Sequence, residues 1–507
     1  MSELIMSISG IRGVVGASLT PEIVHQLVRT WGETFGGPVV VGRDSRPSGS
    51  ALQEVAIDEL LRQGHAVYRV DLVPTPTIGR AVRHWKAAAG LQITASHNPP
   101  QWNGLKFFTA QGRALPPELA TPLLQRLRIS VASSEVPNSK HPTASDQRRA
   151  ASGAVPVKLP ETEDSHSCLE CGEEALQDHL AAVLACVEVD VIRRRAFRVL
   201  VDGNGGAGGP LAVRLLEALG CQVFPLHCVP DGIFRHAPEP TPQSLHQVAP
   251  EVVRCGCDLG VALDTDADRL VLLDEQGRCL SEEFSLALAV EARLRQQPGP
   301  VVTNLSTSRL VELVCQWHGC PCYHTPVGEA HVVDGMLAHV AVLGGEGNGG
   351  IIDPRIGWIR DPFIGMALVL QLLSELKRPL SVVVARWPTL VMRKEKFPLG
   401  QLDWPTVRDR LLARVGNHRP HNESAPVQHS QLLPAEPGKA QGPSSGTSPP
   451  VTVDTRDGVY LGWSDRFLHV RPSNTEPVVR VVAEATSEAD TNLLVRLAHE
   501  AILGSPG

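Results

Sequence analysis

The chain has 507 residues, of which 42% are hydrophobic, so it can form several domains with ordinary cores and is not disordered as a whole. The 47 Lys and Arg residues are outnumbered by 54 Asp and Glu, and the net charge of −7 argues against a broad basic surface for nucleic acid or anionic membranes. No apolar run has the length of a membrane-spanning helix and the first residues lack a secretory signal pattern, so we expect a cytoplasmic protein that binds neither nucleic acid nor membrane.

Most of the chain alternates short apolar runs with helical periodicity, which is the pattern of α/β units. Three such units are predicted, each with a strand, a helix and a second apolar segment. In chain order these segments are Pro38–Gly42, Ser50–Gln63 and Ala66–Val70; Phe197–Asp202, Pro210–Leu219 and Cys221–Phe224; and Val301–Thr303, Ser308–Trp317 and Val340–Leu343.

The C-terminal part differs because strands dominate it and one helix closes it. The predicted strands are Val451–Val453, Tyr460–Trp463, Phe467–Val470 and Val478–Ala483, and the helix is Ser487–Leu503. Residues 130–165 and 417–450 are rich in Ser, Pro or Gly and predict solvated inserts. We therefore expect an α/β protein with three similar domains at 1–130, 171–298 and 299–380, a linker at 131–170, and a distinct α+β domain at 381–507 that contains the insert 417–450.

A glycine-rich turn, Gly203-Asn-Gly205-Gly-Ala-Gly208, fits G-x-G-x-x-G between a predicted strand and helix, as in dinucleotide-binding turns. Such sites need an acidic residue about 20 positions later. The nearest one, Asp231, lies beyond a proline. We interpret the segment as a tight strand-to-helix turn, with a dinucleotide site as the alternative.

The 11 cysteines lie mostly among apolar residues, as free thiols of a reducing compartment do. Cys168-x-x-Cys171 and the group Cys315, Cys320 and Cys322 suggest a metal site, but neither shows the two well-spaced ligand pairs of structural zinc. We interpret both groups as ordinary thiols.

Three carboxylates follow an apolar strand at alternating positions in Asp264-Thr-Asp266-Ala-Asp268-Arg269. Such oxygens are the ligands of a hard divalent cation, and three adjacent Asp would repel one another without one. An EF-hand loop begins in the same way, but its sixth position requires glycine and here holds Arg269. The sequence predicts a cation site that is not an EF-hand.

A second polar loop, Thr94-Ala-Ser96-His97-Asn98-Pro99, precedes Asn103-Gly-Leu-Lys106. By itself it predicts a turn, because Ser, Asn and Pro are turn formers. His97 is adjacent to Ser96 and is poorly placed as the base of a triad. Beside a cation site, however, Ser96 becomes a candidate carrier of a phosphoryl group, with Lys106 to compensate its charge.

Two further loops carry binding groups. Arg471-Pro-Ser473-Asn474-Thr475 offers a guanidinium, two hydroxyls and an amide, which suit a phosphate dianion, although a polar hairpin turn is an equal alternative. In the glycine-rich run 344–350, Glu346 and Asn348 supply acceptor and donor groups for sugar hydroxyls; a passive loop is the alternative.

In this order the four loops, with Ser9-Gly10-Ile11-Arg12-Gly13 near the N-terminus, resemble those of the α-D-phosphohexomutase family. The resemblance implies four domains around a central cleft, each contributing one loop. It also implies that phosphate moves between O1 and O6 of a hexose or hexosamine through a sugar 1,6-bisphosphate, which serves as activator. By the family pattern Ser96 carries the phosphoryl group and holds Mg²⁺ together with the three Asp, while substrate contacts come from His97, Glu346, Asn348, Arg471, Ser473, Asn474 and Thr475, and charge near the phosphoryl group from Arg12, Lys106 and Arg269.

One position departs from the family pattern. Many members read G-E-x-S-G-H in the sugar loop, with the histidine proposed to move protons, whereas Gly350 stands at that place here. Lys106 is then the best remaining candidate for acid–base catalysis. The variant G-E-G-N-G-G resembles a subgroup that favours phosphoglucosamine mutase; phosphomannomutase or phosphoglucomutase is the first alternative and a non-catalytic sugar-phosphate binder the second. We expect a Mg²⁺-dependent enzyme with a phosphosugar substrate, either monomeric or homodimeric.

Overall fold

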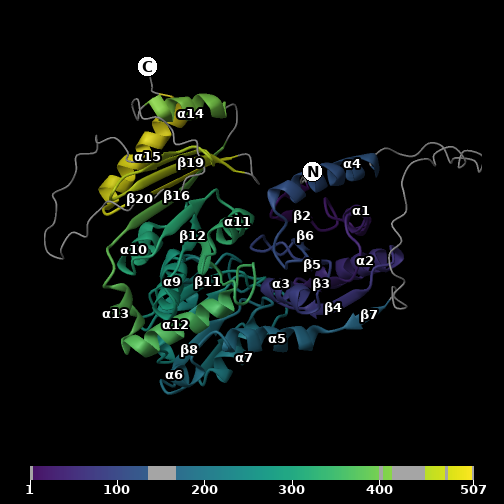
Figure 1. The fold of residues 1–507 in the computed structure, drawn as a ribbon, viewed down its shortest axis with the longest axis horizontal. Coiled ribbons are helices and arrows are strands. Elements are labelled where there is room, and N and C mark those ends of the chain that lie inside the picture. The colour runs from purple at the N-terminus through teal and green to yellow at the C-terminus, as the bar shows by residue number, and fades with distance from the viewer. Residues whose placement is uncertain (1–3, 135–166, 399–402, 414–451, 474–477, 505–507) are drawn as a thin grey trace, which may run out of the picture.

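The structure is a computed structural model that describes residues 4–134, 167–398, 403–413, 452–473 and 478–504 (Figure 1). Within these residues the chain forms four β-sheets in sequence order, of which the first three are mixed and the last is antiparallel. Three α/β units followed by an α+β unit confirm the predicted fold class. The insert 417–450 and the site candidates Asn474 and Thr475 lie outside the described residues.

The first unit is built on a seven-stranded sheet in the order β1-β2-β6-β5-β3-β4-β7. Its strands are β1 Ile5–Ser7, β2 Gly10–Val14, β3 Val39–Arg43, β4 Val67–Leu72, β5 Ala89–Ile93, β6 Trp102–Thr109 and β7 Cys168–Glu170. Its helices are α1 Pro21–Gly32, α2 Gly49–Arg62, α3 Thr75–His84 and α4 Pro117–Ser134. The predicted strands and helix at 38–70 are present within a few residues of their expected ends.

Strand β7 falls inside the stretch 131–170 that the sequence assigns to a linker. Its three residues pair in parallel with residues 67–69 of β4, and α4 extends to residue 134. An edge strand with unpaired backbone groups invites pairing with another chain. Residues 168–170 therefore cover the edge of β4 that would otherwise be unpaired.

The second and third units each hold a four-stranded sheet, in the orders β11-β10-β8-β9 and β13-β12-β14-β15. The second contains β8 Arg198–Asp202, β9 Gln222–Leu226, β10 Leu259–Leu263 and β11 Leu270–Asp274, with α5 Gly172–Leu184, α6 Val189–Arg193, α7 Gly209–Ala218, the 3₁₀-helix Ser244–Gln247 and α8 Ala249–Arg254. The third contains β12 Val301–Asn304, β13 Cys322–Thr325, β14 Leu343–Glu346 and β15 Gly350–Ile352, with α9 Glu283–Gln296, α10 Arg309–Trp317, α11 Glu329–His339, α12 Pro362–Leu376 and α13 Leu380–Val384. One hydrophobic core runs from β8 and β10 through α9 and α12 to β12 and β14, so these two units share their interior.

The predicted apolar segment Val340–Leu343 is a strand only at its last residue. Val340 ends α11 in the left-handed conformation, with φ of 51°, and is 82% exposed. Strand β14 begins at Leu343 and continues to Glu346. Gly344, Gly345 and Gly350 thus lie in strands, whereas Gly347 and Gly349 stay in the loop to which the sequence assigned the whole run.

The three mixed sheets share one topology, and this places the candidate loops. In each, a central strand has parallel partners on both sides, and one of these partners is followed by an antiparallel strand, as in β5–β6, β10–β11 and β14–β15. The serine loop (residues 94–101), the metal loop (264–269) and the sugar loop (347–349) connect these strand pairs. The three loops therefore occupy equivalent positions, at the carboxyl ends of parallel strands, where ligands commonly bind in α/β sheets.

The fourth unit is a five-stranded antiparallel sheet in the order β16-β20-β19-β18-β17, and Figure 1 shows it at one end of the molecule, next to α10 and β12. Its elements are β16 Val391–Pro398, α14 Trp404–Ala413, β17 Thr452–Asp454, β18 Val459–Gly462, β19 Phe467–Pro472, β20 Val478–Ala485 and α15 Glu488–Leu503. The predicted strands and closing helix are present. None of the helices in the described ranges is both long and apolar enough to cross a membrane.

Polar contacts attach the fourth unit to the third. Lys394 of β16 donates to Glu282 at 2.8 Å and to Glu283 at 2.7 Å. Glu484 of β20 accepts the backbone N–H of Arg309 at 3.0 Å, at the start of α10. Since Glu484 is 2% exposed, its charged form has lost most of its hydration.

Replacing Glu484 with Gln should flatten the pH dependence of stability. Burial raises the pKa of Glu484 to about 7, from 4.5 in the unfolded chain, so the folded chain keeps a proton that the unfolded chain loses between these values. The resulting stabilisation, on the order of 3 kcal/mol, is fully present below the unfolded pKa and disappears as the pH rises through the folded one. We expect Tm to fall less between about pH 5 and pH 7.5 in Glu484→Gln than in the wild type. Parallel Tm curves would contradict this assignment.

Candidate active site

The serine loop follows β5 and is held in an unusual backbone conformation. Ser96 has φ of 51°, and its N–H donates to the hydroxyl of Thr94 at 2.9 Å. Its hydroxyl lies 3.3 Å from Nδ1 of His97, and within the described residues this is its one hydrogen-bonding contact. A strained, non-glycine left-handed residue is typical of functional loops. The backbone of Ser96, and not its hydroxyl, therefore makes the hydrogen bonds that fix the loop.

A buried arginine, which sequence analysis missed, shapes this loop. Arg46 is fully buried and donates to three backbone carbonyls of the serine loop, those of residues 96, 98 and 99, and to that of residue 102 at the start of β6, at 2.6–3.0 Å. Its Nε is 3.1 Å from the carboxylate of Asp44, which also accepts the hydroxyl of Thr94 at 2.6 Å. Burial raises the pKa of Asp44, while the Arg46 charge opposes that rise. The signal in the sequence was Gly42-Arg43-Asp44-Ser45-Arg46, a charged run directly after an apolar strand.

The three Asp of the metal loop converge, as predicted. Asp264, Asp266 and Asp268 are at most 1% exposed, and one ligand oxygen from each lies within 4.8 Å of the others. Each carboxylate keeps one buried oxygen, Oδ2, Oδ1 and Oδ1 respectively, without a hydrogen-bond partner. Unpartnered buried oxygens are costly unless a cation takes them up. Among the described residues this is the only group of three or more His, Cys, Asp or Glu that could hold a metal ion.

These features fit a divalent cation such as Mg²⁺, which prefers oxygen ligands. The charges of the loop are unequal: burial and the neighbouring carboxylates of Asp268 and Asp266 raise the pKa of Asp264 well above its ordinary value. Asp268 is also buried, yet Arg360 and Lys106 lower its pKa. The loop is closed by its own backbone, because the N–H groups of Asp268 and Arg269 donate to Oδ1 of Asp264 at 3.0 and 3.1 Å.

The glycine-rich turn 203–208 supports the metal loop instead of a dinucleotide. The N–H of Ala207 donates to the carbonyl of Thr265 at 2.9 Å, and a Cβ on Gly206 would lie 2.6 Å from that oxygen. Glu275, at the twelfth position of an EF-hand, instead accepts the N–H of Ser381 at 3.2 Å. Both contacts agree with the interpretations reached from the sequence.

Four cationic side chains surround the two loops. Lys106 donates to Asp266 at 2.6 Å and to Asp268 at 2.9 Å, and these carboxylates raise its pKa although burial opposes them. Arg12 donates to the side chain of Asn98 at 2.9 Å. Arg269 lies 3.2 Å from Nδ1 of His97, and Arg360 donates to Asp268 at 2.6 Å. These contacts place the Lys106 ammonium beside the metal loop, where its charge compensates those of Asp266 and Asp268.

His97 is a neutral group in this site. The nearby Arg269 charge, followed by burial and the Arg12 charge, lowers the pKa of His97 to about 2. A neutral imidazole can donate or accept a hydrogen bond, but it has no second ring proton to transfer to a substrate.

In the sugar loop Glu346 is fixed by several donors. Its Oε1 accepts the side-chain amide of Asn304 at 2.8 Å and the N–H of Gly328 at 3.0 Å, and its Oε2 accepts from Arg360 at 3.3 Å. Asn348 uses its Oδ1 to accept the N–H of Gly350 at 3.2 Å. The structure thus places Glu346 beside the metal loop, with Arg360 between them.

The loop predicted to bind phosphate, of which Arg471 and Ser473 are described, is linked to Glu346 through the segment 325–328. Arg471, at the end of β19, lies 3.7 Å from the carboxylate of Asp457, and burial lowers its pKa. Asp457 also accepts the N–H of Val327 at 2.9 Å, one residue before the Gly328 that contacts Glu346. Ser473 accepts from Arg480 at 3.3 Å.

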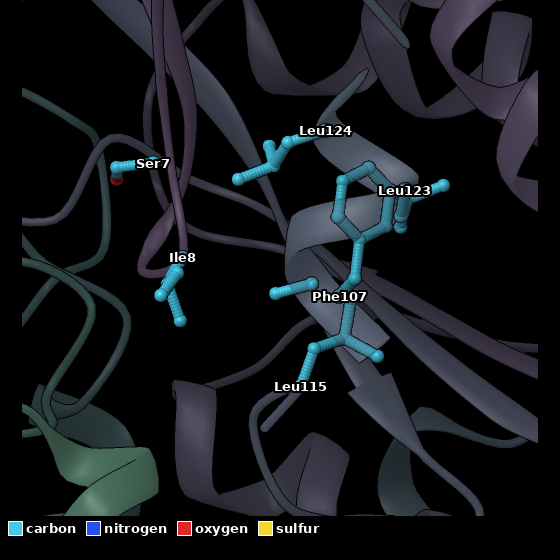
Figure 2. Close-up of a pocket in the computed structure, with 7 residues that line it drawn as sticks. Ser7, Ile8, Phe107, Leu115, Leu123 and Leu124 are labelled. Carbon is cyan, nitrogen blue, oxygen red and sulfur yellow. The ribbon is translucent and has the colours of Figure 1, made fainter. Parts of the chain in front are cut away.

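A small pocket is lined by none of these groups (Figure 2). It is lined by Ser7, Ile8, Phe107, Leu115, Ala120, Leu123 and Leu124, from the β1–β2 turn, β6, α4 and the segment before α4. The hydroxyl of Ser7, its single polar side chain, already donates to the carbonyl of Gly10 at 3.1 Å. The pocket therefore offers nothing to bind a phosphosugar.

Family models match all four units of the chain. Models of phosphoglucomutase/phosphomannomutase α/β/α domains I, II and III match residues 4–129, 177–277 and 282–390. The model of the C-terminal domain matches residues 433–499. The third model begins at residue 282, so it groups α9 with the third unit.

Curated relatives span nearly the whole chain. A probable phosphoglucosamine mutase of Methanopyrus kandleri is 33% identical over 95% of this chain and 93% of its own length. A phosphoglucomutase/phosphomannomutase of Thermococcus kodakarensis is 30% identical over 98% of each chain.

Solved structures share the fold at lower identity. A phosphoglucomutase/phosphomannomutase family protein from Burkholderia thailandensis covers 99% of this chain and 98% of its own, with 24% identity and a TM-score of 0.75. An N-acetylphosphoglucosamine mutase from Aspergillus fumigatus, solved with GlcNAc-6P and magnesium, covers 99% of this chain and 96% of its own, with 15% identity and a TM-score of 0.54.

Proposed function

This chain belongs to the α-D-phosphohexomutase family, and we propose that it interconverts the 6-phosphate and 1-phosphate of a hexosamine or hexose through a phosphorylated Ser96. Its relatives are mutases, and the chain is accordingly an enzyme of the isomerase class that moves a phosphoryl group within one molecule.

The observation that carries this proposal is the junction of the serine and metal loops. The hydroxyl of Thr265 donates to the carbonyl of Ser96 at 2.7 Å, and Lys106 bridges Asp266 and Asp268. A serine whose hydroxyl contacts His97 at 3.3 Å thus lies on a loop bonded to the metal loop, where three carboxylates have unpartnered oxygens. Phosphoryl transfer needs this kind of site, because positioning and charge neutralisation supply most of its catalysis.

The proposed reaction balances over two transfers. The bond between phosphorus and Oγ of phospho-Ser96 breaks while a bond to the free sugar hydroxyl forms, and the proton of that hydroxyl is returned to Oγ. The sugar 1,6-bisphosphate then turns end for end, and Ser96 recovers the other phosphoryl group as its own proton passes to the sugar oxygen. Mg²⁺ on the three Asp and a phosphoserine oxygen would draw negative charge away from the transferring group.

The other candidate site residues fall into groups that would contact the sugar hydroxyls and groups that would contact the phosphates. Glu346, Asn348 and neutral His97 would contact sugar hydroxyls, and Arg471, Ser473, Asn474 and Thr475 would hold the phosphate that does not react. Arg12, Lys106 and Arg269 would compensate the phosphoryl charge, since they lie around the two loops with their charges in place. Support for the ligand class comes from the fungal neighbour, which was solved with GlcNAc-6P and magnesium.

Glucosamine phosphate is the substrate that we favour, because the Methanopyrus relative is a probable phosphoglucosamine mutase. The Thermococcus relative, a phosphoglucomutase/phosphomannomutase, supports glucose or mannose phosphate as the second candidate.

A kinetic comparison of glucosamine, glucose and mannose phosphates tests this choice. We expect the kcat/KM for glucosamine 6-phosphate to exceed that for the other two by about 10-fold or more, a modest ratio because the sugars differ by one group. A preference for glucose or mannose phosphate would select the second candidate. Absence of turnover with all three, in the presence of Mg²⁺ and glucose 1,6-bisphosphate, would refute the enzymatic proposal and leave a sugar-phosphate binder.

We also propose a cytoplasmic location. All 11 cysteines are free in the structure, and the buried ones are packed as small apolar side chains. Unpaired thiols in this number are typical of a reducing compartment.

A further inference from the structure

Arg360 contacts three parts of the candidate site, although no sequence motif pointed to it. It lies just before α12, and its side chain is 11% exposed. Its Nε donates to Glu329 at 2.8 Å, its Nη1 to Glu346 at 3.3 Å and its Nη2 to Asp268 at 2.6 Å. One guanidinium therefore joins the start of α11, the sugar loop and the metal loop.

The side chain of Arg360 passes through the space that a side chain at residue 350 would fill. A Cβ built on Gly350 would overlap Cδ of Arg360 and would lie 3.0 Å from its Cγ. The φ of Gly350 is not positive, so its backbone does not require glycine. The requirement at this position is room for Arg360.

We propose that Arg360 is a positioning residue that is anchored on Asp268 and holds Glu346 and Glu329 in one arrangement, and that Gly350 lacks a side chain so that Arg360 can reach all three. This inference rests on the proposed function, because Glu346 is taken as the contact to the sugar and Asp268 as a metal ligand. Arginine suits the task since its planar fork directs N–H groups along several fixed directions, whereas lysine offers a compact point charge.

Two consequences separate this role from general support of the fold. Arg360 brings a positive charge to Asp268, so its removal should not weaken the binding of a divalent cation at the three Asp. It should weaken the binding of a phosphosugar, because the Oε2 of Glu346 loses its donor and the carboxylate is then held through Oε1 alone, by Asn304 and Gly328. A variant with intact metal binding and impaired sugar binding is therefore the expected signature.

The test is a double-mutant cycle with Gly350→Ala, Arg360→Ala and the double variant, all in a Ser96→Ala background. Binding of glucose 1,6-bisphosphate is measured by calorimetry in saturating Mn²⁺. We expect each single substitution to weaken binding by about 10-fold or more, and the double variant to bind no worse than Arg360→Ala alone. This non-additivity arises because the methyl group at residue 350 acts only by displacing Arg360.

Mn²⁺ binding, followed by electron paramagnetic resonance, supplies the second measurement. We expect a dissociation constant in Arg360→Ala that is equal to or lower than that of the parent. Gly357→Ala is the matched control, because its Cβ would meet its nearest neighbours at 3.5 and 3.7 Å, an ordinary contact distance, in the same segment before α12. It should leave both affinities unchanged. Arg360→Lys, which keeps the charge and loses the fork, should recover only part of the sugar binding.

The outcomes are distinct. Loss of Mn²⁺ binding together with sugar binding in Arg360→Ala, or unchanged sugar binding, would overturn the positioning role. If the losses of bisphosphate affinity in the two single variants multiply in the double variant, the proposal that Gly350 makes room for Arg360 would be overturned. A wild-type protein that turns over no phosphosugar, but shows the expected cycle, would refute the proposed function alone. Absence of bisphosphate binding in the parent would refute both.

Discussion

Ser96→Ala should reduce kcat by about 1,000-fold or more with every phosphosugar, even when glucose 1,6-bisphosphate is supplied. The bisphosphate can restore a dephosphorylated serine, but it cannot restore an oxygen that has been removed. The assay follows the conversion of 1-phosphate to 6-phosphate by ³¹P NMR. Mass spectrometry of the wild-type protein, purified without phosphatase, should find phosphate on Ser96 in part of the population.

The loss in Ser96→Ala should not come from unfolding. The hydroxyl of Ser96 contacts only Nδ1 of His97, at 3.3 Å, while its N–H and carbonyl make the bonds that hold the loop. Ser374→Ala is the control, since this serine is also buried and donates to the carbonyl of Leu370 within α12. The control should lose about 1 kcal/mol of stability and keep its kcat. Full activity of Ser96→Ala would refute the phosphoserine mechanism.

Sequence patterns could predict the loops of the candidate site because each loop is a short chemical motif after an apolar strand. Asp264, Asp266 and Asp268 stand at alternating positions of one short segment, and their spacing alone predicts convergence. The shared topology of the three mixed sheets then brings separate motifs to equivalent strand ends. Local pattern and sheet order were sufficient for these residues.

The residues that connect the loops could not be found in this way. Arg46 acts on carbonyls about 50 positions away, and backbone carbonyls leave no trace in a sequence. Arg360 contacts carboxylates 14, 31 and 92 positions away, in an arrangement that exists only once two units pack together. Gly350 was recognised as a departure from the family pattern, but its steric reason required the path of the Arg360 side chain.

The metal loop leads to the second large effect: Asp264→Asn should abolish turnover while raising the stability of the metal-free protein. Burial and two neighbouring carboxylates already oppose the charge of Asp264, as its raised pKa shows. An asparagine keeps the acceptor for the N–H groups of Asp268 and Arg269, and its amide can donate to the unpartnered oxygens beside it. The substitution therefore relieves repulsion, but it also removes a ligand that the cation needs.

Thermal unfolding with and without Mg²⁺ separates these two effects. At a Mg²⁺ concentration of about 100 times its Kd, the wild type should gain about 2.7 kcal/mol and show a higher Tm. Asp264→Asn should start from a higher Tm in EDTA and gain little from Mg²⁺, with kcat lower by about 1,000-fold or more. A lower Tm in EDTA would mean that Asp264 serves the fold rather than the cation.

Asp274→Asn provides the matched comparison, because Asp274 is fully buried on the adjacent strand β11 and holds Gln276 and Arg278 through hydrogen bonds. Its replacement should lower Tm in EDTA, since a buried carboxyl group loses its ion pair with the half-exposed Arg278, yet it should retain the Mg²⁺-induced rise and the activity. Opposite signs for two buried carboxylates only ten residues apart would follow from their partners: Asp274 has an arginine, whereas Asp264 has two other carboxylates beside it and one oxygen, Oδ2, without a hydrogen-bond partner.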